Sequence, residues 1–341
     1  MVIHAPRMNL HFRKECGCLA RNVVALTCWF LCLPVVADTA IENFAENPLF
    51  NGWKIHGATD LFHWNSSNQN LEVTWDSARS NSFFYRALGT VLTKSDDFSV
   101  AFDLKFQDIQ VGVNPARPFT FQAAVGFLNL AQATSTNFAR GTGINLASGP
   151  RNVIEFDYFP DSGFGATISP TIISSNNQFA TTFNFPLELT TNDRFQVVLS
   201  YTATNQTLAT DIQRNGQPFN LIKEVILDSG FSDFRVDTIA VSSYSDGGAD
   251  GSILAHGTVD DFQIITPGPP LAGFAGAFTN GLWQVQFLTR TNWFYTLERT
   301  ANFEVWTTVS SRDTGTGTYV FLQDAAAPDD RAFYRVKAER P

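Results

Sequence analysis

Apolar and polar residues alternate in short runs along most of the chain. The clearest run is FSVAFDLKF (98–106), where Phe98, Val100 and Phe102 begin a series of apolar residues at every second position. Alternation with a period of two is typical of a strand with one buried face. The pattern predicts a strand here, and similar runs predict strands at 119–127, 153–159, 195–201, 207–214 and 236–244.

The segments between these runs are rich in Asn, Gly, Ser, Thr and Pro, and long helical periodicity is absent from the sequence. The segment YTATNQT (201–207) is typical of a hairpin connection. The chain has 32 Phe and 2 Met, so we expect a core of flat rings between two sheets packed about 10 Å apart. The predicted fold class is all-β, with an antiparallel jelly-roll β-sandwich as the main domain.

One segment divides the chain. ITPGPPLAGFAG (265–276) contains three Pro and three Gly, a composition typical of a linker. We predict a jelly-roll domain over 38–265, a linker over 266–276 and a small β-sandwich over 277–341. In the last part, strands are predicted at LWQVQFL, FYTLERT, VWTTVSS, TYVFLQD and FYRVKAE.

The first 37 residues have the pattern of a signal peptide. Basic residues precede the apolar run NVVALTCWFLCLPVVA, and small residues lead to a cleavage site after Ala37. The run is interrupted by Pro34 and is shorter than the roughly 20 apolar residues of a membrane span. We therefore expect a cleaved leader and a secreted, periplasmic or cell-surface protein, with an uncleaved anchor as the alternative.

Cysteine content and charge exclude several function classes. All four cysteines lie in the leader, so the mature chain has no thiol for a disulfide or a thiolate site. The whole chain has a net charge of −9, and loss of residues 1–37 leaves 19 basic and 31 acidic residues, a net charge of −12. An acidic protein without a Lys/Arg cluster is not suited to binding nucleic acid.

The predicted strand 153–159 carries two carboxylates, Glu155 and Asp157. Residues two apart in a strand share a face and lie about 6.6 Å apart. Ile154 and Phe156 then point to the core, and the simplest interpretation is that the two acids face water.

The same stretch resembles the metal-binding segment of legume-type (concanavalin-like) lectins, which runs Glu, apolar, Asp, any residue, aromatic, Pro, then Asn or Asp. The matching residues are Glu155, Phe156, Asp157, Phe159, Pro160 and Asp161. The resemblance implies that Glu155 binds a transition metal and that Asp157 bridges this metal and calcium. It also implies that the carbonyl of Phe159 and the carboxylate of Asp161 complete the calcium shell, since Ca²⁺ takes oxygen ligands.

The chain departs from that lectin pattern at three places. The pattern has a second Asp and a His where this chain has Ala166 and Thr171. The strand that supplies a sugar-orienting Asp in those lectins is matched by AAVGF (123–127), which has no acid. The resemblance therefore favours the fold and leaves calcium as the candidate cofactor, without the transition metal or the lectins' mode of sugar binding.

A third interpretation is catalytic. Laminarinase-like glycoside hydrolases, which resemble the same lectins, carry Glu-x-Asp followed by a second Glu on one strand. Here Phe159 and Pro160 stand where that Glu belongs, and Asp161 lies about 20 Å from Glu155 along an extended strand. Glycosidases need two carboxyl groups within roughly 5 to 9.5 Å, so we predict no catalytic residues and retain a diverged glycosidase or polysaccharide lyase as the alternative.

Carbohydrate-binding residues are predicted on two other segments. Asp246 and Asp250 lie in a Gly-rich loop before the last strand of the main domain, and Trp64 lies beside His63 and Asn65. An aromatic ring can stack on a sugar while carboxylates accept from its hydroxyl groups. A plain turn is the alternative for the loop and core packing the alternative for the tryptophan.

The C-terminal segment resembles the fibronectin-III-like modules at the ends of exported bacterial proteins, notably in YTLERTANFEVWTTV, FLQD and RAFYRV. The resemblance implies an accessory module. Together these features predict an exported, non-catalytic carbohydrate-binding or surface-interaction protein whose partner is a polysaccharide or glycan. A structural cell-surface module is a further alternative.

Overall fold

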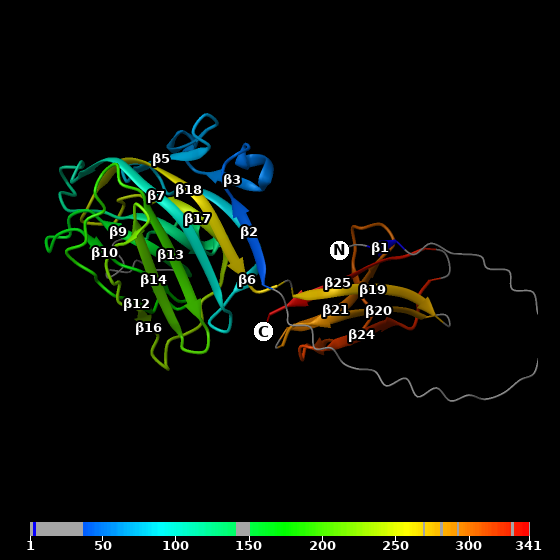
Figure 1. Ribbon diagram of the computed structural model, residues 1–341. Helices are drawn as coiled ribbons and strands as arrows, with labels where there is room; N and C mark the ends of the chain where they lie inside the picture. Colours follow the sequence, from blue (N-terminus) through cyan, green and yellow to red (C-terminus); the bar gives the residue numbers. More distant parts are fainter. Residues whose placement is uncertain are drawn as a thin grey trace, which may run out of the picture. The chain divides into compact units, whose positions relative to one another are not determined.

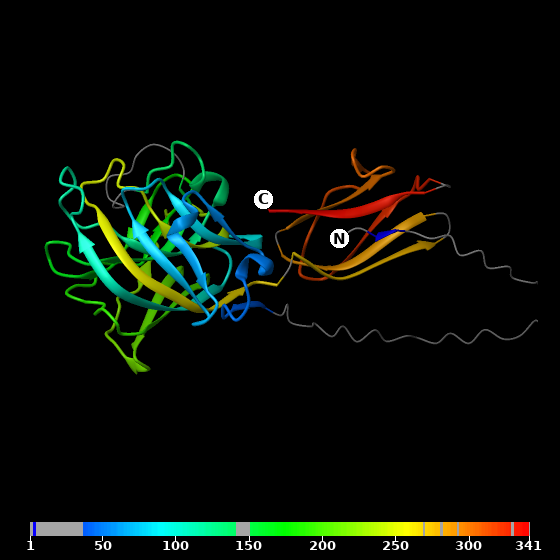
Figure 2. The same cartoon turned by 90° about the horizontal axis from the view of Figure 1, so that it is seen from above.

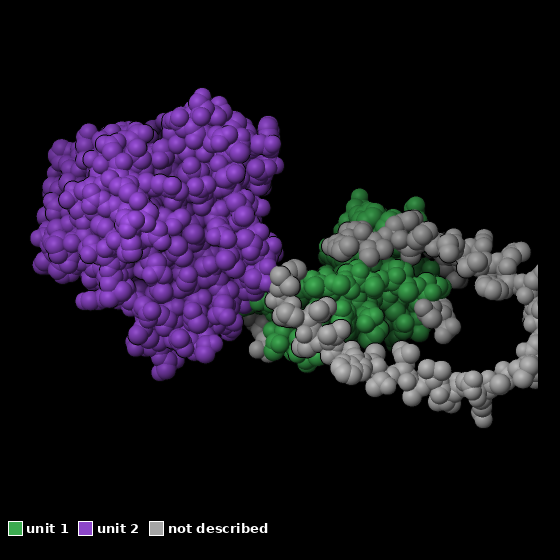
Figure 3. Space-filling view, viewed as in Figure 1, with its two compact units in different colours: residues 1–35, 269–341 green, residues 36–268 purple. Residues whose placement is uncertain are grey.

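The computed structural model describes residues 3–4, 37–140, 151–268, 270–279, 282–291, 293–328 and 331–340. The chain forms two compact units, a larger one over residues 36–268 and a smaller one over residues 1–35 and 269–341 (Figure 3). The division falls inside the segment 266–276 that the composition marks as a linker.

The larger unit contains two antiparallel sheets, which can be followed in Figures 1 and 2. The first, called the front sheet here, has eight strands in the order β12-β11-β9-β8-β17-β6-β3, with β10 paired to β9. Its strands are β3 (Trp53–His56), β6 (Ser82–Leu92), β8 (Ala123–Leu128), β9 (Val153–Phe159), β10 (Thr167–Ile168), β11 (Thr171–Ile173), β12 (Phe179–Thr181) and β17 (Val236–Ser243).

The second, the back sheet, has nine strands in the order β15-β14-β13-β7-β18-β5-β4, with β16 paired to β14 and β2 to β18. Its strands are β2 (Asp38–Glu42), β4 (Phe62–Asn65), β5 (Asn70–Asp76), β7 (Phe98–Val111), β13 (Phe195–Thr202), β14 (Thr207–Arg214), β15 (Gln217–Pro218), β16 (Val225–Ile226) and β18 (Ile253–Thr266). The described helices of this unit are the short η1 (Pro48–Asn51), η2 (Thr59–Leu61) and α1 (Leu130–Ala133).

Aromatic rings from both sheets meet in the core between them. Phe102 of β7 lies 6.1 Å from Phe156 of β9, measured between ring centroids, and Phe106 of β7 lies 5.5 Å from Tyr158 of β9. These contacts orient β9, because they turn its even-numbered residues toward the back sheet. The alternation seen in the sequence thus places the odd-numbered acids on the opposite face of the front sheet.

The predicted all-β fold is confirmed, and most predicted strands lie where the alternation put them. The strands predicted at 153–159 and 207–214 have the bounds of β9 and β14, and those at 195–201 and 236–244 differ from β13 and β17 by one residue. The strand predicted at 119–127 begins later, because β8 starts at Ala123. Residues 119–122 instead lead into the sheet, with Phe119 bridged to Gly251.

Strand β18 contains a bulge. Its register against β7 shifts between Asp260 and Gln263, and Asp261 has a left-handed φ of 49°. Before the bulge, odd-numbered residues such as Val259 are buried, and after it even-numbered residues such as Phe262 are buried. The one extra residue therefore exchanges the faces of the strand.

The smaller unit also consists of two sheets and has its own core around Trp283, Phe287 and Tyr295. One sheet has the order β19-β20-β24, with β19 (Leu271–Thr279), β20 (Leu282–Thr289) and β24 (Tyr319–Asp324). The other has the order β1-β25-β21-β22 with β23 paired to β21, and its strands are β1 (Ile3–His4), β21 (Phe294–Thr300), β22 (Thr307–Thr308), β23 (Asp313–Thr314) and β25 (Phe333–Glu339). These paired sheets agree with the predicted small β-sandwich.

Two elements of the smaller unit lie in segments with another predicted role. Strand β1 lies in the predicted leader, and most of the rest of that leader is outside the described residues. Strand β19 begins inside the predicted linker, where a register shift between Ala272 and Ala275 includes Gly273 with φ 60°. The glycine that suggests a linker in the sequence thus serves a bulge in a strand. Across the described parts of both units, no helix is long and apolar enough to cross a membrane.

Candidate functional site

The two carboxylates of β9 are buried and paired with an arginine. Glu155 and Asp157 are 2% and 1% exposed, and Arg140 is 1% exposed. Nε of Arg140 donates to Oε1 of Glu155, and its Nη2 donates to Oδ2 of Asp157 at 2.8 Å. The interpretation that these acids face water is therefore wrong, because a segment carrying Arg140 covers that face of the front sheet.

Tyr244, which follows β17, completes this group. Its hydroxyl donates to Oε2 of Glu155 at 2.7 Å, and its ring centroid lies 6.0 Å from the guanidinium carbon of Arg140. Both oxygens of Glu155 thus accept a hydrogen bond. We call Arg140, Glu155, Asp157 and Tyr244 the buried cluster.

The electrostatics of the buried cluster follow from its burial. Desolvation raises the pKa of Asp157 well above its usual value, and the neighbouring charge of Glu155 acts in the same direction. Desolvation also raises the pKa of Tyr244, again with a contribution from Glu155. Burial alone would lower the pKa of Arg140, but the carboxylates of Glu155 and Asp157 raise it above its usual value. The guanidinium is therefore the fixed charge of the cluster.

A glycine brings β8 close to the cluster. Gly126 lies opposite Glu155 in the pairing of β8 and β9. A Cβ atom at position 126 would lie 2.3 Å from the carbonyl oxygen of Ile154 and 2.6 Å from Cβ of Glu155. The close approach of the two strands leaves no space for a larger residue at this position.

The predicted metal ligands belong partly to this cluster. Ca²⁺ takes about six to eight oxygen ligands, whereas Glu155 and Asp157 already hold a guanidinium, and Oδ1 of Asp161 accepts from the backbone N–H of Gly163 at 3.1 Å. In the part of the chain that the structure describes, no group of three or more His, Cys, Asp or Glu residues is arranged to hold a metal ion. The residues as arranged do not fit a cation, and the site at Glu155, Asp157, Phe159 and Asp161 stays a prediction.

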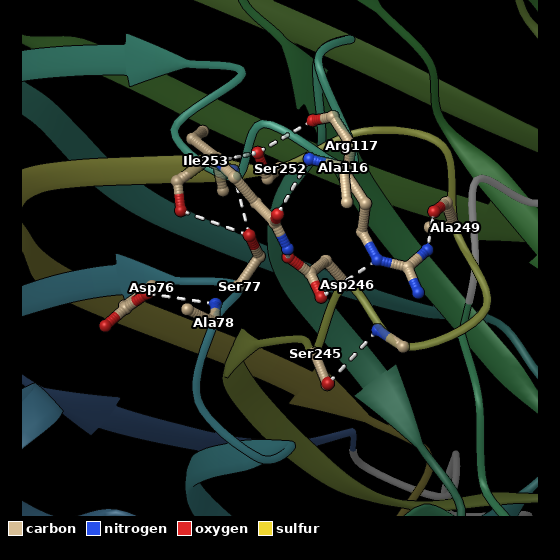
Figure 4. A network of polar contacts seen from close by, with 12 residues as sticks. Asp76, Ser77, Ala78, Ala116, Arg117, Ser245, Asp246, Ala249, Ser252 and Ile253 are labelled. Carbon is tan, nitrogen blue, oxygen red and sulfur yellow. Dashed lines mark hydrogen bonds and ion pairs between the residues drawn. The ribbon is translucent and has the colours of Figure 1, made fainter.

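A second polar network holds the loop that carries Asp246 (Figure 4). Asp246 pairs with Nε of Arg117 at 3.3 Å and accepts from Nδ2 of Asn114 at 3.1 Å, while Arg117 also donates to the carbonyl of Ala249. The backbone N–H of Asp246 donates to the carbonyl of Ser77 at 2.7 Å. Asp246 is 8% exposed, so its carboxylate serves to fix the loop.

Three loops meet at one end of the front sheet. They are residues 117–121 before β8, residues 160–166 after β9 and residues 245–252 after β17, and we call them the end loops. Because β8 pairs antiparallel with both β9 and β17, its beginning lies beside the ends of those two strands. The loops are therefore neighbours although they are far apart in the sequence.

Hydrogen bonds connect the end loops. The N–H of Phe119 donates to the carbonyl of Asp250 at 3.4 Å, and the N–H of Ser252 donates to the carbonyl of Phe119 at 3.0 Å. On the other side, the N–H of Asp161 donates to Oγ1 of Thr120 at 3.4 Å. The segment 117–121 thus joins the loop of Asp161 to the loop of Asp250, which brings these two sequence-predicted residues to the same end of the sheet.

The end loops expose aromatic rings beside exposed acids. Phe119 and Phe164 are 67% and 74% exposed, and Asp161 and Asp250 are exposed as well. The ring of Phe164 lies 5.5 Å from that of Phe185, which is also exposed. Phe164 and Phe185 thus form a contiguous exposed apolar pair, and such patches often mark binding sites, so the group is a candidate binding surface.

Trp64 does not join this group. It lies in β4 opposite Leu71 of β5, and its Nε1 donates to the carbonyl of Phe44 at 2.9 Å. Its ring is partly buried against the core of the larger unit. Ser77, which contacts Asp246, is six residues from Leu71 along the chain, about 20 Å in an extended strand. The structure therefore separates Trp64 from Asp246 and Asp250.

The residues predicted from the sequence do not include Arg140, Tyr244 or the exposed rings of the end loops. A signal for Arg140 was present, because Arg140 and Arg151 are the only basic residues between Arg117 and Arg194. Two acids on an otherwise apolar strand need a counter-charge if they are buried. No comparable signal marks Phe119 or Phe164 among the many phenylalanines.

Comparisons with known proteins concern the fold. No protein-family model matches the chain, and no curated protein matches it in sequence. Among solved structures, peanut lectin with a nine-residue peptide is 14% identical, covers 66% of this chain and 99% of its own, and has a TM-score of 0.41. Lectin II from Ulex europaeus is 9% identical, covers 68% of this chain and 98% of its own, and has a TM-score of 0.43.

A third similar structure is the legume lectin-like domain from Entamoeba histolytica. It is 10% identical, covers 68% of this chain and 97% of its own, and has a TM-score of 0.40. At these identities and TM-scores the likeness implies nothing about what this chain binds.

Proposed function

We propose that this protein is an exported, non-catalytic carbohydrate-binding protein whose ligand contacts the end loops. The observation that carries the proposal is the presence of exposed rings, Phe119 and Phe164, beside exposed carboxylates, Asp161 and Asp250, on loops joined by hydrogen bonds. The apolar face of a sugar stacks on a ring, and its hydroxyl groups donate to carboxylates. Loops held on a rigid sheet are a common position for such sites.

The buried cluster favours binding over catalysis. A glycosidase needs two carboxyl groups that reach the scissile bond. Glu155 and Asp157 are instead covered and paired with Arg140, and Asp161 lies beyond the end of β9. A diverged glycosidase or lyase remains the alternative, and so does a structural surface module with the smaller unit as a fibronectin-III-like accessory. Calcium at Asp157, Phe159 and Asp161 is an alternative to the metal-free arrangement argued below, and the carbohydrate proposal does not depend on it.

A glycan array with the full chain tests the proposal. We expect Phe164→Ala to weaken binding of the best glycan about ten-fold, which corresponds to about 1.4 kcal/mol of lost stacking. Phe50→Ala is the matched control, because Phe50 is 85% exposed but lies in η1, outside the end loops. Equal binding by both variants would place the ligand elsewhere, and no binding to any glycan would favour the structural module.

The catalytic alternative needs its own measurement. Incubation with β-glucans and other polysaccharides is expected to release no reducing ends and no unsaturated products. Turnover that disappears in Glu155→Gln would establish the enzyme instead.

A further inference from the structure

Arg140 lies on both carboxylates that the lectin resemblance assigns to metal ions. In that resemblance Glu155 binds one cation and Asp157 binds two, so the strand is organised around positive charge. Here the positive charge comes from the chain itself, through contacts of Arg140 to Glu155 and Asp157. A guanidinium is permanently charged and presents several donors in one plane, which suits two neighbouring carboxylates.

A second arginine adds to this charge. Arg151 is 2% exposed and donates from Nη1 to the backbone carbonyl of Arg140 at 3.2 Å. Desolvation lowers the pKa of Arg151 to about 10, with a contribution from the charge of Arg140. Two buried guanidinium groups thus accompany two buried carboxyl groups. A divalent cation placed here would face two positive charges, which the low-dielectric interior does not screen.

Arg140 also connects separate parts of the fold. It lies in the segment 129–140, which is attached to the front sheet at several points. The N–H of Leu130 donates to Oδ1 of Asp237 in β17, and Nδ2 of Asn81, directly before β6, donates to the carbonyl of Phe138. Arg140 adds the attachment to β9. In this position Arg140 connects the segment 129–140 to the front sheet, as a bridging cation would.

We propose that the guanidinium of Arg140 takes the structural role of a bound cation, so that this chain holds β9 and the segment 129–140 together without a metal ion. The proposal concerns the folded state of the larger unit and holds whether or not the end loops bind a glycan.

Thermal unfolding of the full chain with CaCl₂, MnCl₂ or EDTA is the first test. A ligand that binds the folded state raises the melting temperature by mass action. We expect the melting temperature to be the same in all three solutions, and elemental analysis of the dialysed protein to find no stoichiometric metal. A lower melting temperature in EDTA, or a retained metal ion, would overturn the proposal.

The second test removes the guanidinium. Arg140→Gly leaves two buried carboxyl groups without their partner, and we expect the melting temperature to fall by about 10 °C. Millimolar guanidinium ion should restore part of this loss, whereas the same concentration of urea should not. Arg79→Gly, which removes the exposed partner of Asp60, is the matched control and should show neither the loss nor the restoration. An unchanged melting temperature in Arg140→Gly would also overturn the proposal.

A third variant covers the case in which Arg140→Gly does not fold. The triple variant Arg140→Met, Glu155→Gln, Asp157→Asn removes the guanidinium and both carboxyl groups together, and replacing a whole buried ion group costs less than breaking it. We expect the triple variant to fold and to melt above Arg140→Gly. A triple variant that melts lower than the single one would contradict the role given to the guanidinium.

Discussion

Arg140 shows how one residue determines what two carboxylates can do. Glu155 and Asp157 have the spacing of metal ligands or of the first two acids of a glycosidase, and the sequence alone leaves both chemistries open. The contacts with Arg140 and Tyr244 give them a structural role instead. The spacing of Glu155 and Asp157 can be read from the sequence. What the two carboxylates can bind depends on Arg140, which lies 15 positions before Glu155.

Asp260 is a second single residue whose environment has a testable effect, here on the pH dependence of stability. It lies opposite Asp103 beside the β18 bulge, near Asp261 and Arg194. Desolvation raises the pKa of Asp260 to about 6, with a further contribution from the charge of Asp261. Because the pKa is higher in the folded than in the unfolded state, the stability that this group contributes is present at low pH and is lost as the pH rises through about 6.

We therefore expect Asp260→Asn to stabilise the protein at pH 8 by about 1 kcal/mol, allowing for partial solvent screening, and to have little effect near pH 4. Urea unfolding at the two pH values measures the difference. A variant that is less stable than the parent at pH 8 would show that the ionised carboxylate makes a favourable contact.

At the scale of elements, alternation was sufficient where a strand has one clear buried face, as in β13 and β14. It was not sufficient at 119–122, where the apolar run continues but the backbone turns to bridge Gly251. It also missed β19, because the Gly-rich sequence LAGFAGAFT resembles a linker while its bulge needs those glycines. In both segments the structure depends on contacts with residues far away in the sequence. A local pattern of apolar and polar residues does not report such contacts.

The bridge between the end loops predicts an effect of Gly251. A Cβ atom at this position would lie 1.7 Å from the carbonyl oxygen of Thr120. We expect Gly251→Ala to separate the two loops, to destabilise the larger unit by about 2 kcal/mol and to weaken glycan binding. Gly247→Ala in the same loop is the control, because the nearest atom to its Cβ, Oγ of Ser245, is 3.4 Å away. Equal stability of the two variants in urea would contradict this account.

At the scale of the whole molecule, the chain has two cores with no residue in common among those described. We expect two transitions in calorimetry. Leu297→Ala, in the core of the smaller unit, should lower the free energy of unfolding of that unit by about 2 to 4 kcal/mol. The transition of the larger unit should be unchanged. Leu199→Ala, in the larger unit, should do the reverse. A single transition that both variants shift would show that the units unfold together.

Export of the whole protein also stays a prediction. The leader pattern predicts that the mature protein begins at Asp38, where β2 begins. Sequencing of the N-terminus of the protein from the culture medium or periplasm checks this.

The extra residue in β18 has a consequence for tolerated changes in chain length. Deleting Asp261 would join the parts of β18 before and after the bulge. Their buried residues would then follow one alternation, and Val259 and Phe262 would both still point inward. Deleting His256, five residues earlier, would turn Gly257 and Val259 outward. Homologous chains that lack one residue at the bulge should therefore keep the same hydrophobic face, whereas losses elsewhere in this strand should be rare.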